Sequence, residues 1–351
     1  MGTAELSCAS LEALARDQSC QVAAVVTQPD RPKGRELKRQ PSPVKALALQ
    51  LGLPVLEPER ARDEKFISEL RGLAPNLIVV VAYGQILPPS ILDLPRHGCL
   101  NVHTSLLPKY RGAAPIQWAI ANGETGTGVT IMKMDAGLDT GPIVAQRRTP
   151  IQSMDDSATL HDRLAQLGAE LLLQTIPDFV AGKIQPQPQP AEGVSHASKI
   201  KKEDGRIDWN LPARMIRDRL RAFTPWPGAF TFLPVEGAAS SAPLFAKGQG
   251  SDNPFPSKMI KIWKAEVVEQ SDGRDGPPGR PLGGTNSTGR LGEATLPKKP
   301  GEILSADKNG IVVACGQNAL RVLELQPEGG RRMSAAEFLA GHALKPGDKF
   351  K

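Results

Sequence analysis

The chain has 351 residues, a formal net charge of +6, 40% hydrophobic residues and only 4% aromatic residues, a composition that suits two globular domains of ordinary size. Its four cysteines, Cys8, Cys20, Cys99 and Cys315, form no C-x-x-C pair and have no histidines at ligand spacing, so we expect neither a disulfide framework nor a metal site. No run approaches the roughly 18 apolar residues of a membrane span, and we expect a cytoplasmic protein that binds no membrane.

The first half of the chain alternates apolar runs of strand length with segments of helical periodicity. The predicted strands are residues 21–26, 54–56, 77–81, 100–103 and 129–134. The predicted helices are residues 10–16, 44–51, 63–73 and 157–181. Strands that alternate with helices predict an α/β domain with a doubly wound, Rossmann-like parallel sheet, which binds ligands at the carboxyl ends of its strands.

The composition changes after Gly182. Residues 183–193 (KIQPQPQPAEG) have no periodicity and are typical of an extended connector, so we predict a first domain at 1–182, a linker at 183–206 and a C-terminal domain at 207–351. A helix at 213–223 is followed by short predicted strands at 229–233, 259–268, 302–306, 310–314 and 320–325, which suggest a small β-barrel. Two stretches rich in Gly, Pro and Ser, 237–257 and 271–299, are expected to be exposed and poorly ordered insertions.

The positive charge is concentrated in the C-terminal part. Residues 199–351 hold 24 Lys and Arg against 17 Asp and Glu, whereas residues 1–198 hold 19 against 20. A domain that binds a polyanion would have this distribution, but so would a domain with a merely basic surface. Charge alone does not separate the two interpretations.

Two polar residues occupy the predicted strand 100–103. Asn101 and His103 are two positions apart, so their side chains point to the same face and bring an amide donor and an imidazole to the end of the strand. This arrangement can stabilise an oxyanion. The alternative is a strand-end histidine whose hydrogen bonds are satisfied within the core.

The segment 101–141 resembles the folate-dependent formyltransferases. Their pattern is Asn-x-His, then Ser-Leu-Leu-Pro-x-x-Arg-Gly, then Leu-Asp-x-Gly, and the chain matches it at Asn101, His103, Ser105–Pro108, Arg111-Gly112 and Leu138–Gly141. The resemblance implies that Asn101, His103 and Asp139 are the catalytic residues. It leaves Asp135, a second carboxylate nearby, as a turn or structural residue.

The same resemblance implies a folate site in two segments. Residues 82–88 (AYGQILP) resemble the family's loop that closes over the folate pterin, where a glycine permits close approach of the backbone to a flat ring. An ordinary strand-to-helix turn is the alternative for this segment. The expected folate-binding residues are Tyr83, Gly84, Gln85, Ile86, Leu87, Ser105, Leu106, Leu107 and Pro108.

A basic loop indicates which branch of the family the chain resembles. Residues 27–45 are similar to the loop with which methionyl-tRNA formyltransferases reach the acceptor end of tRNA, although a solvated loop would have the same composition. Segments 199–209, 216–230 and 323–338 resemble that family's linker and OB-like C-terminal domain, which implies a tRNA-binding domain there. The expected tRNA-binding residues of the loop are Arg31, Lys33, Arg35, Lys38 and Arg39.

The resemblance therefore implies a monomeric enzyme that transfers the formyl group of 10-formyltetrahydrofolate to the α-amino group of initiator methionyl-tRNA without a metal. A formyltransferase acting on an amino-sugar nucleotide also has a C-terminal barrel, and the basic loop is what argues against it. A single-domain formyltransferase that acts on glycinamide ribonucleotide would leave residues beyond about 200 unexplained. A non-catalytic RNA-binding derivative of the same scaffold would not need Asn101, His103 and Asp139.

The beginning of the sequence departs from the family pattern. The family opens with a hydrophobic strand and a Gly-Thr-Pro-Asp-Phe turn, whereas here residues 2–6 (GTAEL) occupy the place of the turn and no strand precedes them. The missing strand would lie centrally in a doubly wound sheet, between the strands at 21–26 and 100–103, so we expect the natural protein to begin about ten residues upstream with an apolar strand. The alternative is a rearranged sheet in which the neighbouring strands close together.

Overall fold

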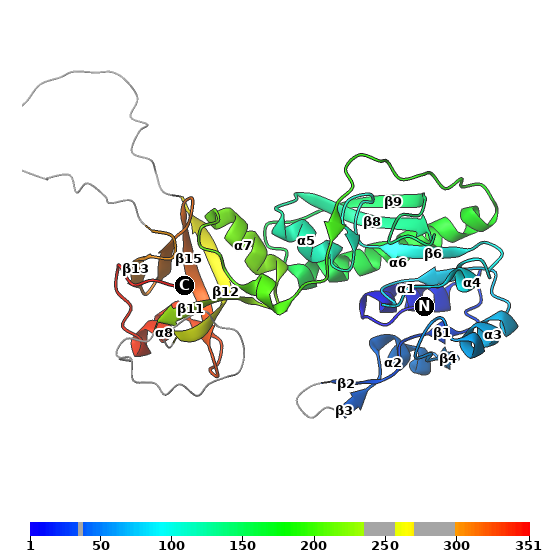
Figure 1. Cartoon of the computed structure of the whole chain (residues 1–351), viewed down its shortest axis with the longest axis horizontal. Coiled ribbons are helices and arrows are strands. Elements are labelled where there is room, and N and C mark those ends of the chain that lie inside the picture. The colour runs from blue at the N-terminus through cyan, green and yellow to red at the C-terminus, as the bar shows by residue number, and fades with distance from the viewer. Residues whose placement is uncertain (34–37, 235–256, 270–298) are drawn as a thin grey trace, which may run out of the picture. The chain divides into compact units, whose positions relative to one another are not determined.

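The computed structural model describes residues 1–33, 38–234, 257–269 and 299–351. They form two compact units, Met1–Ile200 and Lys201–Lys351 (Figure 1). Both predicted Gly/Pro-rich insertions fall almost entirely outside the described residues. No helix among the described residues is long and apolar enough to cross a membrane.

The first unit contains a four-stranded sheet and a separate parallel pair. The strands of the sheet, in spatial order, are β5 (Ile78–Val80), β6 (Cys99–His103), β8 (Gly126–Lys133) and β9 (Ile143–Pro150). The separate pair is β1 (Val25–Val26) with β4 (Val55–Leu56). The prediction of a parallel sheet is confirmed for β5 and β6 but wrong for β8 and β9, which are antiparallel to their neighbours. The turn at 134–142 contains no helix, so the chain returns directly alongside β8.

Met1 and Gly2 lie between β1 and β5. The Gly2 amide donates to Val26 O over 2.9 Å, and Gly2 pairs in parallel with Val81. The Met1 amino group donates to Val79 O over 2.7 Å. A cavity of about 580 Å³, lined mainly by residues that precede β1 and β5 and by apolar side chains of helices, adjoins these two residues. Thus β1 and β5 do not close against each other. The place expected for the missing strand, between the strands at 21–26 and 100–103, lies instead between β1 and β5.

Helices cover both faces of the sheet. They are α1 (Leu6–Arg16), α2 (Pro43–Gln50), α3 (Glu64–Gly72), α4 (Pro89–Leu92), α5 (Pro115–Ala121) and α6 (Ser157–Val180). Side chains of α3 and α4 pack with Ile78 and Val80 of β5. Helix α6 packs on β6, β8 and β9, and it approaches β6 so closely that a Cβ at Gly168 would lie 2.8 Å from Val102 Cγ1. Since side chains alternate along a strand, Asn101 and His103 face away from α6.

Residues 183–200, which we call the strap, run from α6 back along the first unit. Gln187 exchanges backbone hydrogen bonds with Ile143 at the start of β9. Farther on, β10 (His196–Ala197) pairs in parallel with β7 (Arg111–Gly112). The Trp118 indole of α5 donates to Ser198 O over 2.8 Å. The strap is therefore anchored along its length to elements of the first unit.

The second unit is an antiparallel sheet with two helices. Its elements are the 3-10 helix Lys202–Gly205, α7 (Ala213–Ala222), β11 (Ala229–Pro234), β12 (Ser257–Val268), β13 (Ile303–Asp307), β14 (Gly310–Ala314), β15 (Ala319–Pro327), β16 (Met333–Ser334) and α8 (Ala335–Gly341). The strand order is β11-β12-β15-β14-β13, with β16 on β15. Trp209, Phe338 and Phe350 join the strands' aliphatic side chains in one core. The edge strands β11 and β13 do not pair with each other in this order.

Candidate active site

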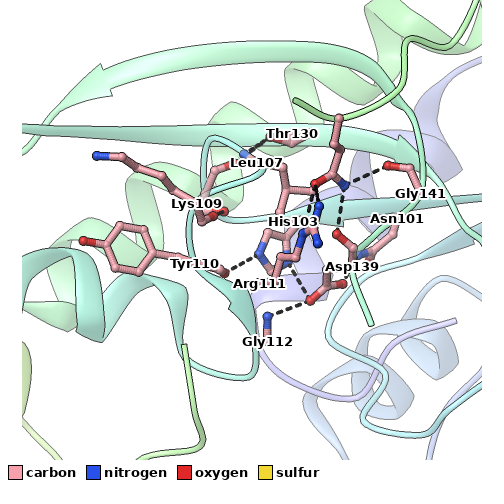
Figure 2. A network of polar contacts seen from close by, with 12 residues as sticks. Asn101, His103, Leu107, Lys109, Tyr110, Arg111, Gly112, Thr130, Asp139 and Gly141 are labelled. Atoms are coloured by element: carbon pink, nitrogen blue, oxygen red, sulfur yellow. Dashed lines mark hydrogen bonds and ion pairs between the residues drawn. The ribbon is translucent and has the colours of Figure 1, made fainter. Parts of the chain in front are cut away.

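Strand β6 carries two of the predicted catalytic residues at its carboxyl end. Asn101 is partly buried and His103 is buried, and both project toward Asp139 (Figure 2). Asn101 Nδ2 lies 3.5 Å from Asp139 Oδ1, and His103 Nδ1 lies 3.7 Å from Asp139 Oδ2. The structure thus brings the three residues together, as the spacing and the resemblance predict.

Asp139 lies in a turn that holds its backbone in the left-handed region, with a φ of 54°. Asp135 shapes this turn, because its Oδ1 accepts hydrogen bonds from the Gly137 amide and from Thr140 Oγ1. At Gly141 a Cβ would lie 1.8 Å from Lys133 O, so only glycine fits there. Asp135 therefore serves the turn, and the Asp139 carboxylate is the one that reaches β6.

The ring of His103 is held on both sides. Its Nε2 lies 2.9 Å from Tyr110 O, and because a carbonyl only accepts hydrogen bonds, Nε2 carries the proton. Its Nδ1 faces the Asp139 carboxylate, whose Oδ2 also accepts the Gly112 amide over 2.8 Å. The histidine can consequently act on a substrate only through Nδ1.

The segment 104–112 forms a tight turn over the end of β6. Thr130 Oγ1 donates to Ser105 O over 2.7 Å and accepts the Leu107 amide over 3.1 Å, and Gln146 donates to Leu107 O. Ser105 and Leu107 are buried, whereas Leu106 and Pro108 are partly exposed. Of the predicted folate residues in this segment, Leu106 and Pro108 are therefore the more accessible.

The predicted pterin loop, residues 82–88, contains both buried and exposed residues. The Tyr83 ring belongs to the core beneath β5, and burial raises the pKa of its hydroxyl to about 12. This hydroxyl has no hydrogen-bond partner among the described residues. The Gln85 side chain accepts the Ala61 amide over 2.7 Å, and Leu87 is buried. Ile86 is 87% exposed, and Gly84 has a φ of +80°. Ile86 and the Gly84 backbone are thus the parts of this loop available to a ligand.

The basic loop forms a hairpin of β2 (Arg31–Lys33) and β3 (Lys38–Gln40). Lys45 Nζ binds Asp30 Oδ2 over 2.8 Å and Glu57 Oε2 over 2.9 Å, so one ammonium group is shared by these two carboxylates next to the hairpin. Arg31 and Arg39 are exposed, whereas Arg35 lies outside the described residues. The hairpin therefore presents Arg31 and Arg39 to solvent, beside two carboxylates that share one lysine.

The sequence interpretation missed several residues that hold this site. Thr130, Gln146 and Gln189 all bind backbone atoms of the two turns that surround Asn101 and His103. Gln189 belongs to the glutamine-proline repeat of the strap, where composition suggested only a connector. Nothing in its local pattern distinguishes it from Gln185 and Gln187. Among the described residues, no group of three His, Cys, Asp or Glu side chains could hold a metal ion.

The chain belongs to the formyl transferase family. The family's formyl transferase domain matches residues 2–176, and its formyl transferase C-terminal domain matches residues 199–343. A protein named methionyl-tRNA formyltransferase from Citrifermentans bemidjiense is 44% identical over 347 residues, which cover 99% of this chain and 94% of that protein. A protein of the same name from Caldanaerobacter subterraneus is 45% identical and covers 100% of this chain and 98% of that protein.

Solved structures share the fold. The N-formyltransferase from Helicobacter canadensis, in complex with folinic acid and dTDP-3-aminofucose, superposes with a TM-score of 0.58 at 17% identity, covering 92% of this chain and 96% of that chain. HypX from Aquifex aeolicus, in complex with tetrahydrofolic acid, superposes with a TM-score of 0.52 at 17% identity, covering 90% of this chain and 46% of that chain. Both units of the chain therefore have counterparts in known formyltransferase architecture.

Proposed function

We propose that this protein transfers the formyl group of 10-formyltetrahydrofolate to the α-amino group of initiator methionyl-tRNA. The observation that carries the proposal is the convergence of Asn101 and His103 on Asp139, at 3.5 and 3.7 Å from its carboxylate. The chain is also 44% and 45% identical to two enzymes of that name over nearly its whole length. The proposed roles of the residues follow from their hydrogen-bonding capacity.

Activation of the formyl carbonyl is the larger chemical task. The α-amino group of an aminoacyl ester has a pKa of about 8 or lower, so a usable fraction is neutral near pH 7 without a dedicated base. Attack of this nitrogen on the formyl carbon places negative charge on the formyl oxygen. Asn101 Nδ2, whose contact with Asp139 is long at 3.5 Å, has a hydrogen to donate to that oxygen. His103 is the second candidate, and it donates from Nδ1 only as an imidazolium, with a proton on both ring nitrogens.

The same attack leaves a positive charge on the nucleophilic nitrogen. Asp139 can accept the proton that this nitrogen loses, directly or through water, and the Gly112 amide fixes the carboxylate that receives it. Collapse of the tetrahedral intermediate breaks the bond to the folate nitrogen, which leaves protonated. The products are the N-formylated aminoacyl ester and tetrahydrofolate.

The folate site is proposed along the two segments that flank β6. Ile86 and Gly84 are exposed, and Leu106 and Pro108 are partly exposed on the neighbouring turn. The Gln28 amide packs against Gly84, where its Nε2 lies 2.6 Å from the position that a Cβ would take. These groups suit an apolar, flat ring that needs close backbone contact. The buried side chains of Tyr83, Leu87, Ser105 and Leu107, with Gln85, support the shape of the two segments.

Transfer RNA would meet positive charge on each unit. In the first unit, the hairpin presents Arg31 and Arg39, with Lys33, Arg35 and Lys38 in the same loop. In the second unit, Lys261 and Arg332 lie 5.9 and 5.3 Å from the Trp263 ring centroid, and Arg206 lies 5.6 Å from that of Phe232. Such cations bind phosphates, and the aromatic rings beside them stack with unpaired bases.

We further infer that the second unit closes into an OB-like barrel through its last residues. Lys351 exchanges two backbone hydrogen bonds with Phe232 of β11, while Glu302, next to β13, pairs with Lys349. The C-terminal segment thus contacts both edges of the antiparallel sheet. We also propose that the enzyme acts as a monomer in the cytoplasm, because one chain supplies every described site residue and charged initiator tRNA is used there.

A formyl-transfer assay with purified protein, 10-formyltetrahydrofolate and charged tRNAs tests the function. We expect formylation of initiator methionyl-tRNA and much slower formylation of elongator methionyl-tRNA, with kcat lowered by about 10² or more in His103→Ala and Asp139→Ala. A nucleotide-linked amino sugar is the competing acceptor. Transfer to that sugar alone would assign the amino-sugar activity, and absence of transfer to either acceptor would favour a non-catalytic RNA-binding protein.

A further inference from the structure

A single side chain of the strap joins the two turns of the active site. Gln189 Nε2 donates to Asp139 O and to Gly141 O, each over 2.8 Å. Gln189 Oε1 accepts from Arg111 Nε over 3.1 Å and from Arg111 Nη2 over 2.6 Å. Arg111 directly precedes Gly112, whose amide binds the Asp139 carboxylate (Figure 2). Gln189 therefore binds the Asp139 turn through one end of its amide and the β7 segment through the other.

We propose that Gln189 is a positioning residue for the Asp139 carboxylate, a role that rests on the proposed formyl transfer. Both hydrogens of its amide are used on carbonyl oxygens, and its oxygen receives two guanidinium hydrogens. If the Gln189 amide were flipped, its oxygen would face the carbonyl oxygens of Asp139 and Gly141, and its nitrogen would face the Arg111 guanidinium. The two carbonyl acceptors and the guanidinium donors therefore fix a single orientation of the Gln189 side chain.

The Asp139 turn needs such support. Aspartate tolerates the left-handed backbone at φ 54° better than most residues, but the conformation is uncommon for any residue with a side chain. The turn that carries the Asp139 and Gly141 carbonyls is exposed at residues 135–138 and at Thr140, and Asp135 holds its far end. Gln189 binds the carbonyl of Asp139 itself, so its loss would free the residue that carries the carboxylate.

The strap also holds the opposite turn. The Arg111 amide donates to Ser195 O over 2.9 Å, and the Tyr110 amide donates to Ser195 Oγ over 2.9 Å. Tyr110 is the residue whose carbonyl binds His103 Nε2. The same stretch of chain therefore sets the position of the carboxylate through Gln189 and of the imidazole through Ser195.

Two substitutions at one position separate positioning from general support. Gln189→Ala removes every contact of the amide, whereas Gln189→Glu retains an acceptor for Arg111 and loses both donors to the Asp139 turn. We expect either change to lower kcat by up to about 10²-fold, with KM for folate and for tRNA unchanged, because a displacement of about 1 Å at a catalytic group has effects of this size. Gln187→Ala is the matched control, because within the described part of the chain that side chain donates only to Gln185 O, a neighbour in the strap.

Hydrogen exchange of the Gly112 amide gives a readout that does not depend on activity. This amide donates to Asp139 Oδ2, so we expect it to exchange faster in both Gln189 variants and at the wild-type rate in Gln187→Ala. Lower kcat together with faster Gly112 exchange supports the proposal. Unchanged exchange, unchanged kcat, or a rise in KM with kcat intact overturns it. A wild-type protein that formylates no aminoacyl-tRNA refutes the proposed function instead, and the exchange measurement still decides whether Gln189 holds Asp139.

Discussion

The size of the effect at Asn101 can distinguish two roles for its side chain. If Asn101 only orients Asp139, replacement by alanine removes one hydrogen bond whose length, 3.5 Å, exceeds the usual 2.7–3.2 Å range. Such a bond contributes about 0.5–1.5 kcal/mol, which corresponds to roughly a ten-fold change at most. If Asn101 donates to the oxyanion, its loss costs about 10²–10³ in kcat. We expect the larger loss in Asn101→Ala.

The measurement is a single-turnover formyl transfer to initiator methionyl-tRNA with enzyme in excess and saturating folate. The dissociation constant for tRNA and the melting temperature should remain near the wild-type values, because Asn101 lies at the end of β6 and is only partly buried. Asn122→Ala is the matched control, since this amide binds the Tyr110 hydroxyl away from the reacting groups. A loss in Asn101→Ala of less than ten-fold would remove Asn101 from the oxyanion site.

Three further predictions concern other parts of the chain. Replacing Arg31 and Arg39 with alanine should weaken tRNA binding and reduce the slope of log K against log salt by about 0.9 or less per lost phosphate contact; an unaltered slope would make the hairpin a solvated surface. Burial raises the pKa of the Cys99 and Cys315 thiols to about 12, so both should resist iodoacetamide at pH 8 until the protein unfolds, and rapid labelling would refute this. Ser334→Ala removes a capping box from α8 and should lower the free energy of unfolding by about 1 kcal/mol in urea titrations.

Most elements of the fold could be predicted because they follow apolar periodicity. The helix expected at 157–181 is α6 (Ser157–Val180), and the strand expected at 310–314 is β14. The strand expected at 21–26 is limited to Val25 and Val26, because only these residues find a partner, in β4. Strand direction could not be predicted from alternation alone, since β8 and β9 are joined by a turn without a helix.

Periodicity in the sequence could predict the candidate site only for residues that lie on the same strand. Alternation along a strand is enough to place Asn101 and His103 on one face, and the resemblance added Asp139. No local rule could reveal that Gln189, which lies 50 residues after Asp139 in the sequence, binds the Asp139 carbonyl. Such long-range contacts depend on the packed structure. The burial of Tyr83, Ser105 and Leu107 likewise depends on tertiary packing that the sequence does not encode locally.

Close packing behind β6 leads to a last prediction, at Gly168 of α6. A Cβ there would lie 2.8 Å from Val102 Cγ1, closer than real Cβ contacts allow, and the side chain of valine is stiff about χ1. Gly168→Ala should therefore push α6 from the sheet or displace Val102, lowering the free energy of unfolding by about 1–3 kcal/mol although alanine favours helix.

Because Val102 stands between Asn101 and His103, the same displacement should lower kcat. Gly72→Ala, at a helical glycine with nothing within 4 Å of the added Cβ, is the matched control and should leave both stability and kcat at least at the wild-type level. The double variant Gly168→Ala with Val102→Ala adds one methyl group to the helix and removes two from the strand, among them the Cγ1 that the new Cβ would meet, and should regain part of the lost stability. Denaturant titration and single-turnover rates measure the two effects. A Gly168→Ala protein as stable as the control variant would mean that α6 does not press on the catalytic strand.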